Sequence, residues 1–210
     1  MVSINLSTEL NQAIRQAAEI ISRGGVAAFP TDTVYGIGAH INSASAVKRI
    51  YVIKGREEIK PLQLLLASIQ EIDRVAIEIP DEARALAEAF LPGGLTIVLK
   101  KSPSVPGLVT AGLDTVAVRV PGHPVCLELV KAVGAPIAAT SANLSGRPSA
   151  IDAQEVRSQL GSQVDIIIDG GPAPLGMDST IIDLTQNPPK LLREGAVPRG
   201  AVLRVCPALC

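Results

Sequence analysis

Three basic side chains, Lys54, Arg56 and Lys60, lie within seven residues of one another and between two apolar segments of the chain. Cationic groups this close together can bind an anion such as a phosphate through charge-assisted hydrogen bonds. Gly55 indicates the end of the first apolar segment, and Pro61 stiffens the return into the second. A solvated loop would explain the cluster equally simply, so the spacing alone leaves both interpretations open.

Small polar residues follow several apolar segments that read as buried strands. The loops after these segments are "TDTVYGIGA", "SPSVPGLVTAG", "SANLSG" and "PAPLGMDST". In open α/β sheets, ligands bind at the carboxyl ends of strands, where glycine and serine let backbone N–H groups approach an anion. The same residues are ordinary turn formers. Four such loops together with a cationic cluster favour an anion site but do not name its ligand.

The elements that must position these residues alternate between helix and strand. Apolar residues at helical spacing predict helices over residues 8–23, 43–55, 81–91 and 124–134, with Ser43 as an N-cap and Asp152 and Glu155 as a further capping pair. Ser68 and Glu71 also form a capping signature. Strands are predicted over residues 26–30, 62–67, 95–101, 115–121, 136–140, 165–171, 179–185 and 190–195. The alternation predicts an α/β fold, and the closing strands without helices between them predict a mixed sheet.

The composition is that of one globular domain. The chain has 210 residues, 47% of them hydrophobic and 19% charged, with a net charge of −1. We predict a single domain over residues 1–210, with its core at about residues 10–200 and a short, peripheral C-terminal tail at residues 201–210. The sequence shows no signal peptide and no apolar run as long as a membrane span, which predicts a cytoplasmic protein without membrane contact.

Several familiar motifs are absent from the sequence. It contains no GxxxxGK[ST] loop, no GxGxxG after a strand and no HExxH, and its two histidines, His40 and His123, read as turn residues. The three cysteines have no CxxC spacing. We therefore predict no protein metal centre and no histidine-based triad.

Five segments in order resemble the signatures of the YrdC/TsaC-type threonylcarbamoyl-AMP synthase family. They are "FPTDTVYGIGA", "IKGREEIKPL", "TVAVRVP", "ATSANLSG" and "DSTIID". The resemblance extends from about residue 10 to residue 200 and corresponds to the short, single-domain form of the family. It implies a twisted α/β sheet, with flanking helices and a large concave cationic groove.

The resemblance also implies an activity. Such enzymes convert L-threonine, bicarbonate (or CO2) and ATP into L-threonylcarbamoyladenylate and pyrophosphate, with Mg²⁺ accompanying the ATP. A threonylcarbamoyl-transfer complex then delivers the group to adenosine 37 of tRNAs that read ANN codons. The resemblance is also compatible with weak binding of tRNA by the chain itself.

The family pattern assigns residues to two subsites. The ATP contacts it implies are Lys54, Arg56, Lys60, Thr115, Ser141, Asn143, Ser149 and Arg193. The threonine contacts it implies are Thr33, Arg119 and Ser179, with the arginine as a fork for the carboxylate.

This sequence departs from the family at one position. Many relatives carry a histidine at the end of the strand after K-P-L, where this chain has Leu65. Leu65 could face the groove and add apolar surface to the threonine pocket, or it could point into the core. No general base stands out, because Asp32 and Asp178 could equally organise their loops.

Two other functions are compatible with parts of the sequence. A non-catalytic RNA-binding module would also use basic residues, although the near-neutral charge and the 2% aromatic content argue against it. A carbamoyltransferase related to hydrogenase maturation would share the domain, although the chain has no room for the additional units of those proteins.

Overall fold

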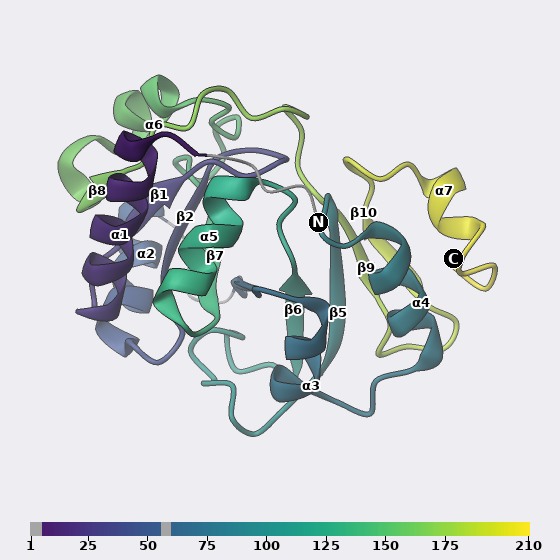
Figure 1. Cartoon of the computed structure of the whole chain (residues 1–210). Coiled ribbons are helices and arrows are strands. Elements are labelled where there is room, and N and C mark those ends of the chain that lie inside the picture. Colours follow the sequence, from purple (N-terminus) through teal and green to yellow (C-terminus); the bar gives the residue numbers. More distant parts are fainter. Residues whose placement is uncertain (1–5, 56–59) are drawn as a thin grey trace.

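The computed structural model describes residues 6–55 and 60–210 and places them in one mixed sheet flanked by helices (Figure 1). The helices are α1 (Thr8–Ser22), α2 (Ala44–Lys54), α3 (Ile72–Val75), α4 (Asp81–Phe90), α5 (Pro124–Val133), α6 (Ala153–Leu160) and α7 (Arg199–Leu203), with 3-10 turns η1 (Ile69–Glu71) and η2 (Gly161–Gln163). The strands are β1 (Ala27–Phe29), β2 (Gly36–His40), β3 (Gln63–Leu65), β4 (Ala76–Ile77), β5 (Leu95–Lys101), β6 (Thr115–Arg119), β7 (Ile137–Ser141), β8 (Ile166–Ile167), β9 (Thr180–Asp183) and β10 (Lys190–Arg193). The predicted α/β class with a mixed sheet is confirmed.

The strand order is β10-β9-β5-β6-β3-β7-β2-β1-β8, with β4 added beside β5. The pairs β1–β8, β3–β6 and β5–β9 are parallel, whereas the neighbouring pairs β3–β7 and β5–β6 are antiparallel. Strands from distant parts of the sequence therefore lie side by side in the middle of the sheet, which brings their loops together.

Several helices begin and end where local chemistry predicts. The Ser43 hydroxyl accepts a hydrogen bond from the Ala46 N–H at 3.4 Å, and the Asp152 carboxylate accepts one from the Glu155 N–H at 2.7 Å. Gly55 ends α2 in the left-handed conformation, with φ of 56°. The predicted cap at Ser68 is wrong, because its side chain makes no capping hydrogen bond.

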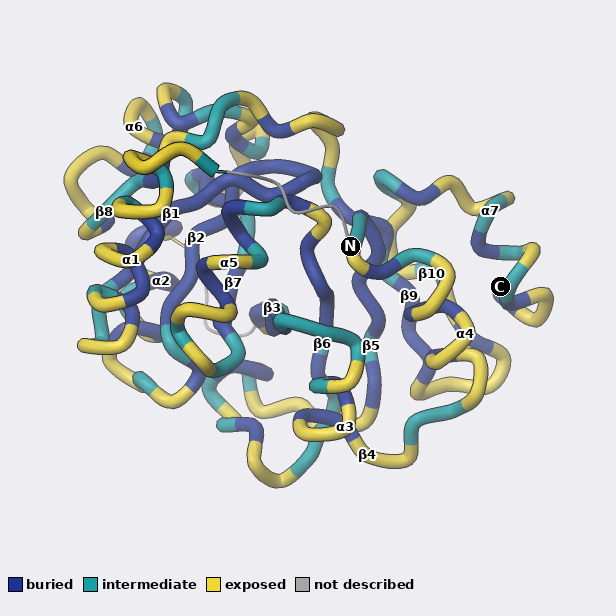
Figure 2. Tube along the Cα trace, in the orientation of Figure 1, coloured by how far each residue is buried: buried dark blue, intermediate teal, exposed yellow. Residues whose placement is uncertain are grey.

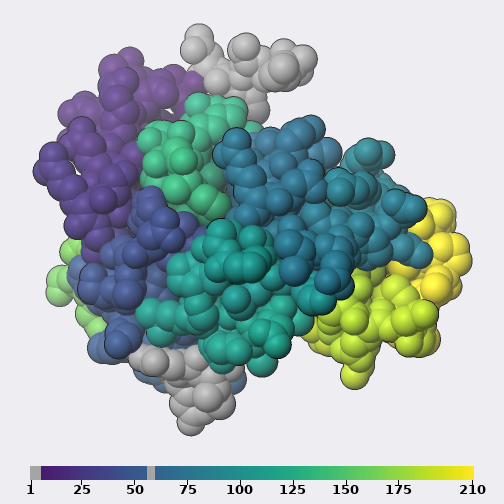
Figure 3. Space-filling view, turned by 90° about the horizontal axis from the view of Figure 1, so that it is seen from below, coloured from purple at the N-terminus to yellow at the C-terminus, as the bar shows by residue number. Residues whose placement is uncertain are grey.

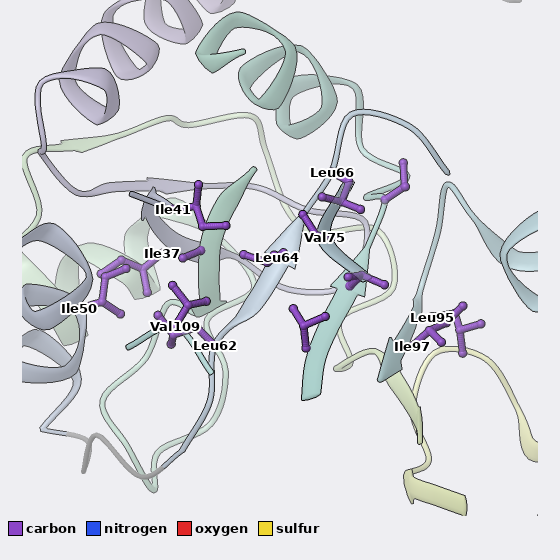
Figure 4. Close-up of a cluster of buried hydrophobic side chains, with 14 of the residues drawn as sticks. Ile37, Ile41, Ile50, Leu62, Leu64, Leu66, Val75, Leu95, Ile97 and Val109 are labelled. Atoms are coloured by element: carbon purple, nitrogen blue, oxygen red, sulfur yellow. The ribbon is translucent and has the colours of Figure 1, made fainter. Parts of the chain in front are cut away.

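Helices cover both faces of the sheet. Helices α1 and α5 pack on one face over Phe29, Leu65 and Ile137. Helices α2, α4 and α6 pack on the other, where Figure 4 shows Ile50 of α2 beside Ile37. The strands between these layers are largely buried, whereas the helices are exposed on their outer sides (Figure 2). No helix of the described ranges is long and apolar enough to cross a lipid bilayer.

The segment "TDTVYGIGA", predicted as a loop, contains strand β2. Its glycines serve close packing: a Cβ atom at Gly38 would lie 2.5 Å from the Ile137 side chain and 3.1 Å from the ring of Phe29. Glycine in this strand is therefore explained by the neighbouring side chains rather than by phosphate binding.

The C-terminal residues are more integrated than the sequence suggests. They lie at the end of the molecule farthest from α1, shown in yellow in Figures 1 and 3. Val202, Cys206 and Leu209 are buried in the larger core cluster. The Cys210 backbone N–H donates to the Pro189 carbonyl at 2.9 Å. The tail predicted to be peripheral thus contributes side chains to the core.

Candidate functional site

A cavity of ≈ 370 Å³ opens on the face of the sheet that α1 and α5 partly cover. Successive side chains of a strand point to opposite faces, so alternate residues of β3, β5, β6 and β7 form the cavity floor. Strand pairing places Ala117 and Ala139 on either side of Gln63. These two small side chains leave the middle of the floor open.

Six of the residues expected to bind substrates line this cavity: Thr33, Lys60, Arg119, Ser141, Ser179 and Arg193. They come from separate parts of the chain that the strand order brings together. Of the other expected residues, Thr115 lies on the same side of β6 as Ala117, and Ser149 donates to the cavity-lining Asp178 at 3.1 Å. Arg56 lies outside the described residues.

Arg119 is fixed in the deep end of the cavity and is 2% exposed. Its Nε donates to the Gly93 carbonyl at 2.9 Å, one terminal nitrogen donates to Thr33 Oγ1 at 2.7 Å, and the other donates to Asp32 Oδ1 at 2.7 Å. The Gly122 N–H also donates to Asp32 Oδ1, at 2.8 Å. The guanidinium is therefore positioned before any ligand binds, with two of its five N–H bonds unpartnered among the described residues.

Lys54 lies beneath the "SANLSG" loop and is 3% exposed. Its ammonium donates to the Ser141 carbonyl at 2.5 Å, the Asn143 carbonyl at 2.7 Å and Asn143 Oδ1 at 3.1 Å. Asn143 in turn donates to the Leu144 and Arg147 carbonyls. Lys54 and Asn143, two of the expected ATP contacts, hold the turn that presents Ser141. The Ser141 hydroxyl also donates to Asn143 Oδ1 at 2.6 Å. Their contact with ATP stays a prediction.

Arg193 closes the opposite side of the cavity. Its Nε donates to the Ser179 carbonyl at 2.9 Å, one terminal nitrogen to Ser179 Oγ at 3.1 Å, and the other to Asp178 Oδ2 at 3.3 Å. This packing requires Gly195, because a Cβ atom there would lie 2.2 Å from the Asp178 carbonyl oxygen. Asp178 thus links Arg193 to Ser149 and organises that wall.

Two buried side-chain polar atoms have no hydrogen-bond partner in the part of the chain that the structure describes: Asp32 Oδ2, in the carboxylate that pairs with Arg119, and His123 Nδ1. Burial lowers the pKa of His123, although the charge of Asp32 opposes this, so the imidazole is neutral near pH 7. Burial also lowers the pKa of Arg119, opposed by Asp32, and raises the pKa of the nearby Cys126 thiol. Cys126 therefore stays protonated and is unsuited to act as a nucleophile.

Leu65 points into the core. It is 1% exposed and belongs to the cluster beneath α1 and α5, so the interpretation that it adds apolar surface to the cavity is wrong. The cavity-facing residue of β3 is Gln63, two positions earlier. Gln63 and Thr96 were not among the expected site residues, because each is a single polar residue within an apolar run, at residues 62–67 and 95–99.

Similarity to known proteins agrees with this geometry. Residues 19–195 match the Sua5/YciO/YrdC family model, described as "Telomere recombination". The chain belongs to this family. The family member described here is 46% identical to a Pyrococcus abyssi protein named threonylcarbamoyl-AMP synthase, over 97% of this chain and 60% of the relative. It is 40% identical to a Mycobacterium tuberculosis protein named putative threonylcarbamoyl-AMP synthase, over 93% of this chain and 89% of the relative.

The solved structures include a close match. The structure of P. abyssi Sua5 complexed with L-threonine has a TM-score of 0.90 and 48% identity to this family member, over 91% of this chain and 56% of that one. The chain thus spans about 60% of the length of the P. abyssi relative. The predicted YrdC-like fold is confirmed.

Tyr35 ties the first polar loop to a later one and provides a test of the site's framework. Its hydroxyl donates to the Gly171 carbonyl at 2.7 Å and accepts from the Gly170 N–H at 3.3 Å. We expect Tyr35→Phe to lower the free energy of unfolding by about 1 kcal/mol near pH 7, measured by urea denaturation.

The pH dependence of the same variant checks the burial of the phenol. Burial raises the pKa of Tyr35 from 10.0 to about 12. Because the unfolded chain loses this proton first, wild-type stability should fall by up to about 1.4 kcal/mol per pH unit between pH 10 and 12, and Tyr35→Phe should lack this component. If the free energy of unfolding changed equally with pH in the two proteins over this range, the raised pKa of Tyr35 would be contradicted.

Proposed function

We propose that this chain synthesises L-threonylcarbamoyladenylate from L-threonine, bicarbonate or CO2, and ATP, releasing pyrophosphate. The observation that carries the proposal is the single cavity that gathers Thr33, Arg119 and Ser179 beside Lys60 and Arg193. The names of the relatives and the L-threonine complex of P. abyssi Sua5 support it.

The cavity offers complementary groups for the two substrates. Arg119 presents its remaining N–H bonds to the carboxylate of threonine, which suits the planar fork of a guanidinium. Lys60, Ser141 and Arg193 lie across the floor, where they would hold the ATP phosphates and neutralise charge that develops on the departing pyrophosphate.

The reaction has two steps. The threonine amine attacks CO2 and loses a proton, giving a carbamate. A carbamate oxygen then attacks the α-phosphate of ATP, and the bond to the β-phosphate breaks with release of pyrophosphate. Holding both reactants in one cavity supplies much of the rate by positioning. Asp32 and Asp178 act here by holding Arg119 and Arg193.

Mg²⁺ would enter as its complex with ATP. In the described parts of the chain, no three His, Cys, Asp or Glu residues group as a metal site. Asp178 lines the cavity, and its oxygens accept from Ser149 and Arg193. A cavity with a single carboxylate among its described residues, one that already has partners, fits a magnesium ion held largely by phosphate and water, as is usual for nucleotide-bound magnesium. The ion would offset the negative charge of the phosphates.

The broader pathway is part of the same proposal. The product would pass to a threonylcarbamoyl-transfer complex for modification of tRNA position 37, and the protein would act in the cytoplasm. Incubating the chain with ATP, threonine and bicarbonate tests the function directly. Mass spectrometry should detect the adenylate, and its absence at all enzyme concentrations would reject the proposal.

The same assay tests selectivity for the threonine methyl group. Ala117, Val98 and Ile181 provide an apolar part of the lining against which a methyl group can pack. One methyl group in such a pocket is worth about 1–3 kcal/mol, so we expect roughly 10- to 200-fold preference for threonine over serine. Competition between the two amino acids, with products separated by mass, measures the ratio. Equal use of both would show that the cavity does not bind the methyl group.

A further inference from the structure

A chain of hydrogen bonds crosses the cavity floor from Arg193 to Gln63. Arg193 donates to Ser179 Oγ at 3.1 Å, Ser179 Oγ lies 2.8 Å from Thr96 Oγ1, and Thr96 Oγ1 donates to Gln63 Oε1 at 3.0 Å. Ser179 is 3% exposed and Thr96 is 1% exposed, so the middle of the chain is shielded from water.

The direction of this chain follows from the number of protons. A hydroxyl group has one proton to donate. Thr96 donates its proton to Gln63, so Ser179 must be the donor in the contact between the two hydroxyls. Arg193 can only donate, which agrees with Ser179 accepting from it. All the bonds therefore point the same way, toward Gln63.

The Gln63 carboxamide lies with its oxygen toward Thr96. Gln63 and Thr96 lie on strands that flank β6, and the small side chain of Ala117 allows the contact between them. The carboxamide oxygen is held by Thr96, so the nitrogen must lie on the other side of the group. That nitrogen has no hydrogen-bond partner among the described residues, and Gln63 lines the cavity.

We propose that Gln63 is a specificity-determining residue that donates a carboxamide N–H to an anionic oxygen of the amino-acid substrate. The inference rests on the proposed function and deepens it by naming a further contact. Gln63 is the cavity-facing polar residue of β3, whereas Leu65, the next residue on that side of the strand, is buried in the core.

The same chain defines the polarity of the site. Ser179 gives its proton to Thr96 and therefore faces a ligand as an acceptor, suited to the amine or hydroxyl group of an amino acid. Gln63 and Arg119 face the ligand as donors, suited to a carboxylate or carbamate. Donors and an acceptor in these places favour one orientation of an amino acid over its reverse.

Titration calorimetry on the full chain can test this, with L-threonine and ATP measured separately. Gln63→Glu keeps the shape and the oxygen that Thr96 binds, but replaces the donor with a negative charge. We expect its dissociation constant for threonine to rise at least about tenfold, with ATP binding changed less than twofold. Gln63→Met, which removes the donor without adding charge, should weaken threonine binding about three- to tenfold.

Control variants separate this role from a general one. Gln70→Glu makes the same change at an exposed position in η1 and should leave threonine binding unaltered. Thr96→Val should release the carboxamide and weaken threonine binding, whereas Thr96→Ser, which keeps the hydroxyl, should restore it.

The outcomes are distinct. Unchanged threonine binding in folded Gln63→Glu would overturn the inference while leaving the proposed function standing, as would equal loss of threonine and ATP binding. If Gln63→Glu does not fold, unchanged threonine binding by Gln63→Met decides against the inference. Failure of the wild-type chain to bind threonine at all would overturn both proposals.

Discussion

Replacing Arg119 with leucine is expected to lower the free energy of unfolding by about 3–5 kcal/mol and to abolish threonine binding. The loss of stability follows from Asp32, whose carboxylate pairs with Arg119 at 2.7 Å and would be left buried without its partner. Urea denaturation measures the first effect, and calorimetric titration with threonine measures the second.

Arg119→Lys separates charge from geometry. An ammonium keeps the charge beside Asp32 but cannot donate to Gly93, Thr33 and Asp32 while also forming a fork for a carboxylate. We expect threonine binding to weaken by roughly tenfold or more, with a smaller loss of stability than in Arg119→Leu. Unchanged binding in the lysine variant would remove Arg119 from the substrate site.

A matched control is available on the surface. Arg157 forms an ion pair with Asp169 at 3.5 Å, and both side chains are more than half exposed, at 54% and 56%. Arg157→Leu should change the free energy of unfolding by about 0–1 kcal/mol, because exposed ion pairs contribute little. A similar loss in both leucine variants would contradict the special role of the buried pair.

Replacing Lys54 with methionine is expected to destabilise the protein by about 2–4 kcal/mol and to reduce adenylate synthesis at least tenfold. The ammonium donates to two carbonyl groups and to Asn143 Oδ1, and methionine would remove these three charge-assisted hydrogen bonds. Because the turn at residues 141–143 would relax, Ser141 would lose its position in the cavity. Denaturation and the mass-spectrometric assay measure the two effects.

Lys48→Met is the control on the same helix. Lys48 is exposed on α2, so its replacement should change stability by less than about 0.5 kcal/mol and leave synthesis unchanged. If Lys54→Met were as stable and active as Lys48→Met, the buried ammonium would not be what holds the loop.

Local patterns in the sequence were sufficient for much of the fold. The helix from Ala44 to Lys54 has a capping serine before it and a left-handed glycine after it, and both signals act over a few residues. Strand β2 was missed because its glycines resemble turn residues. Gly38 is needed because a side chain there would collide with Ile137, about a hundred positions away in the chain.

The sequence by itself determined the α/β class, most elements and the set of polar loops that follow buried strands. Periodicity and capping depend on neighbouring residues, and the family pattern is a property of residue order. These signals identified Thr33, Arg119, Ser179 and Arg193, all of which line one cavity. Their binding of substrates remains a prediction.

Only the tertiary structure decided where each side chain points. Lys54 is directed into the protein beneath Ser141, although it belongs to the same basic cluster as the cavity-lining Lys60. Leu65 packs into the core while Gln63, two residues before it, lies in the cavity. A period of two shows that they share a side of β3, but which part of that side α5 covers depends on strand order and helix packing. Strand order and helix packing are set by contacts between distant segments, and local sequence patterns carry no information about these contacts.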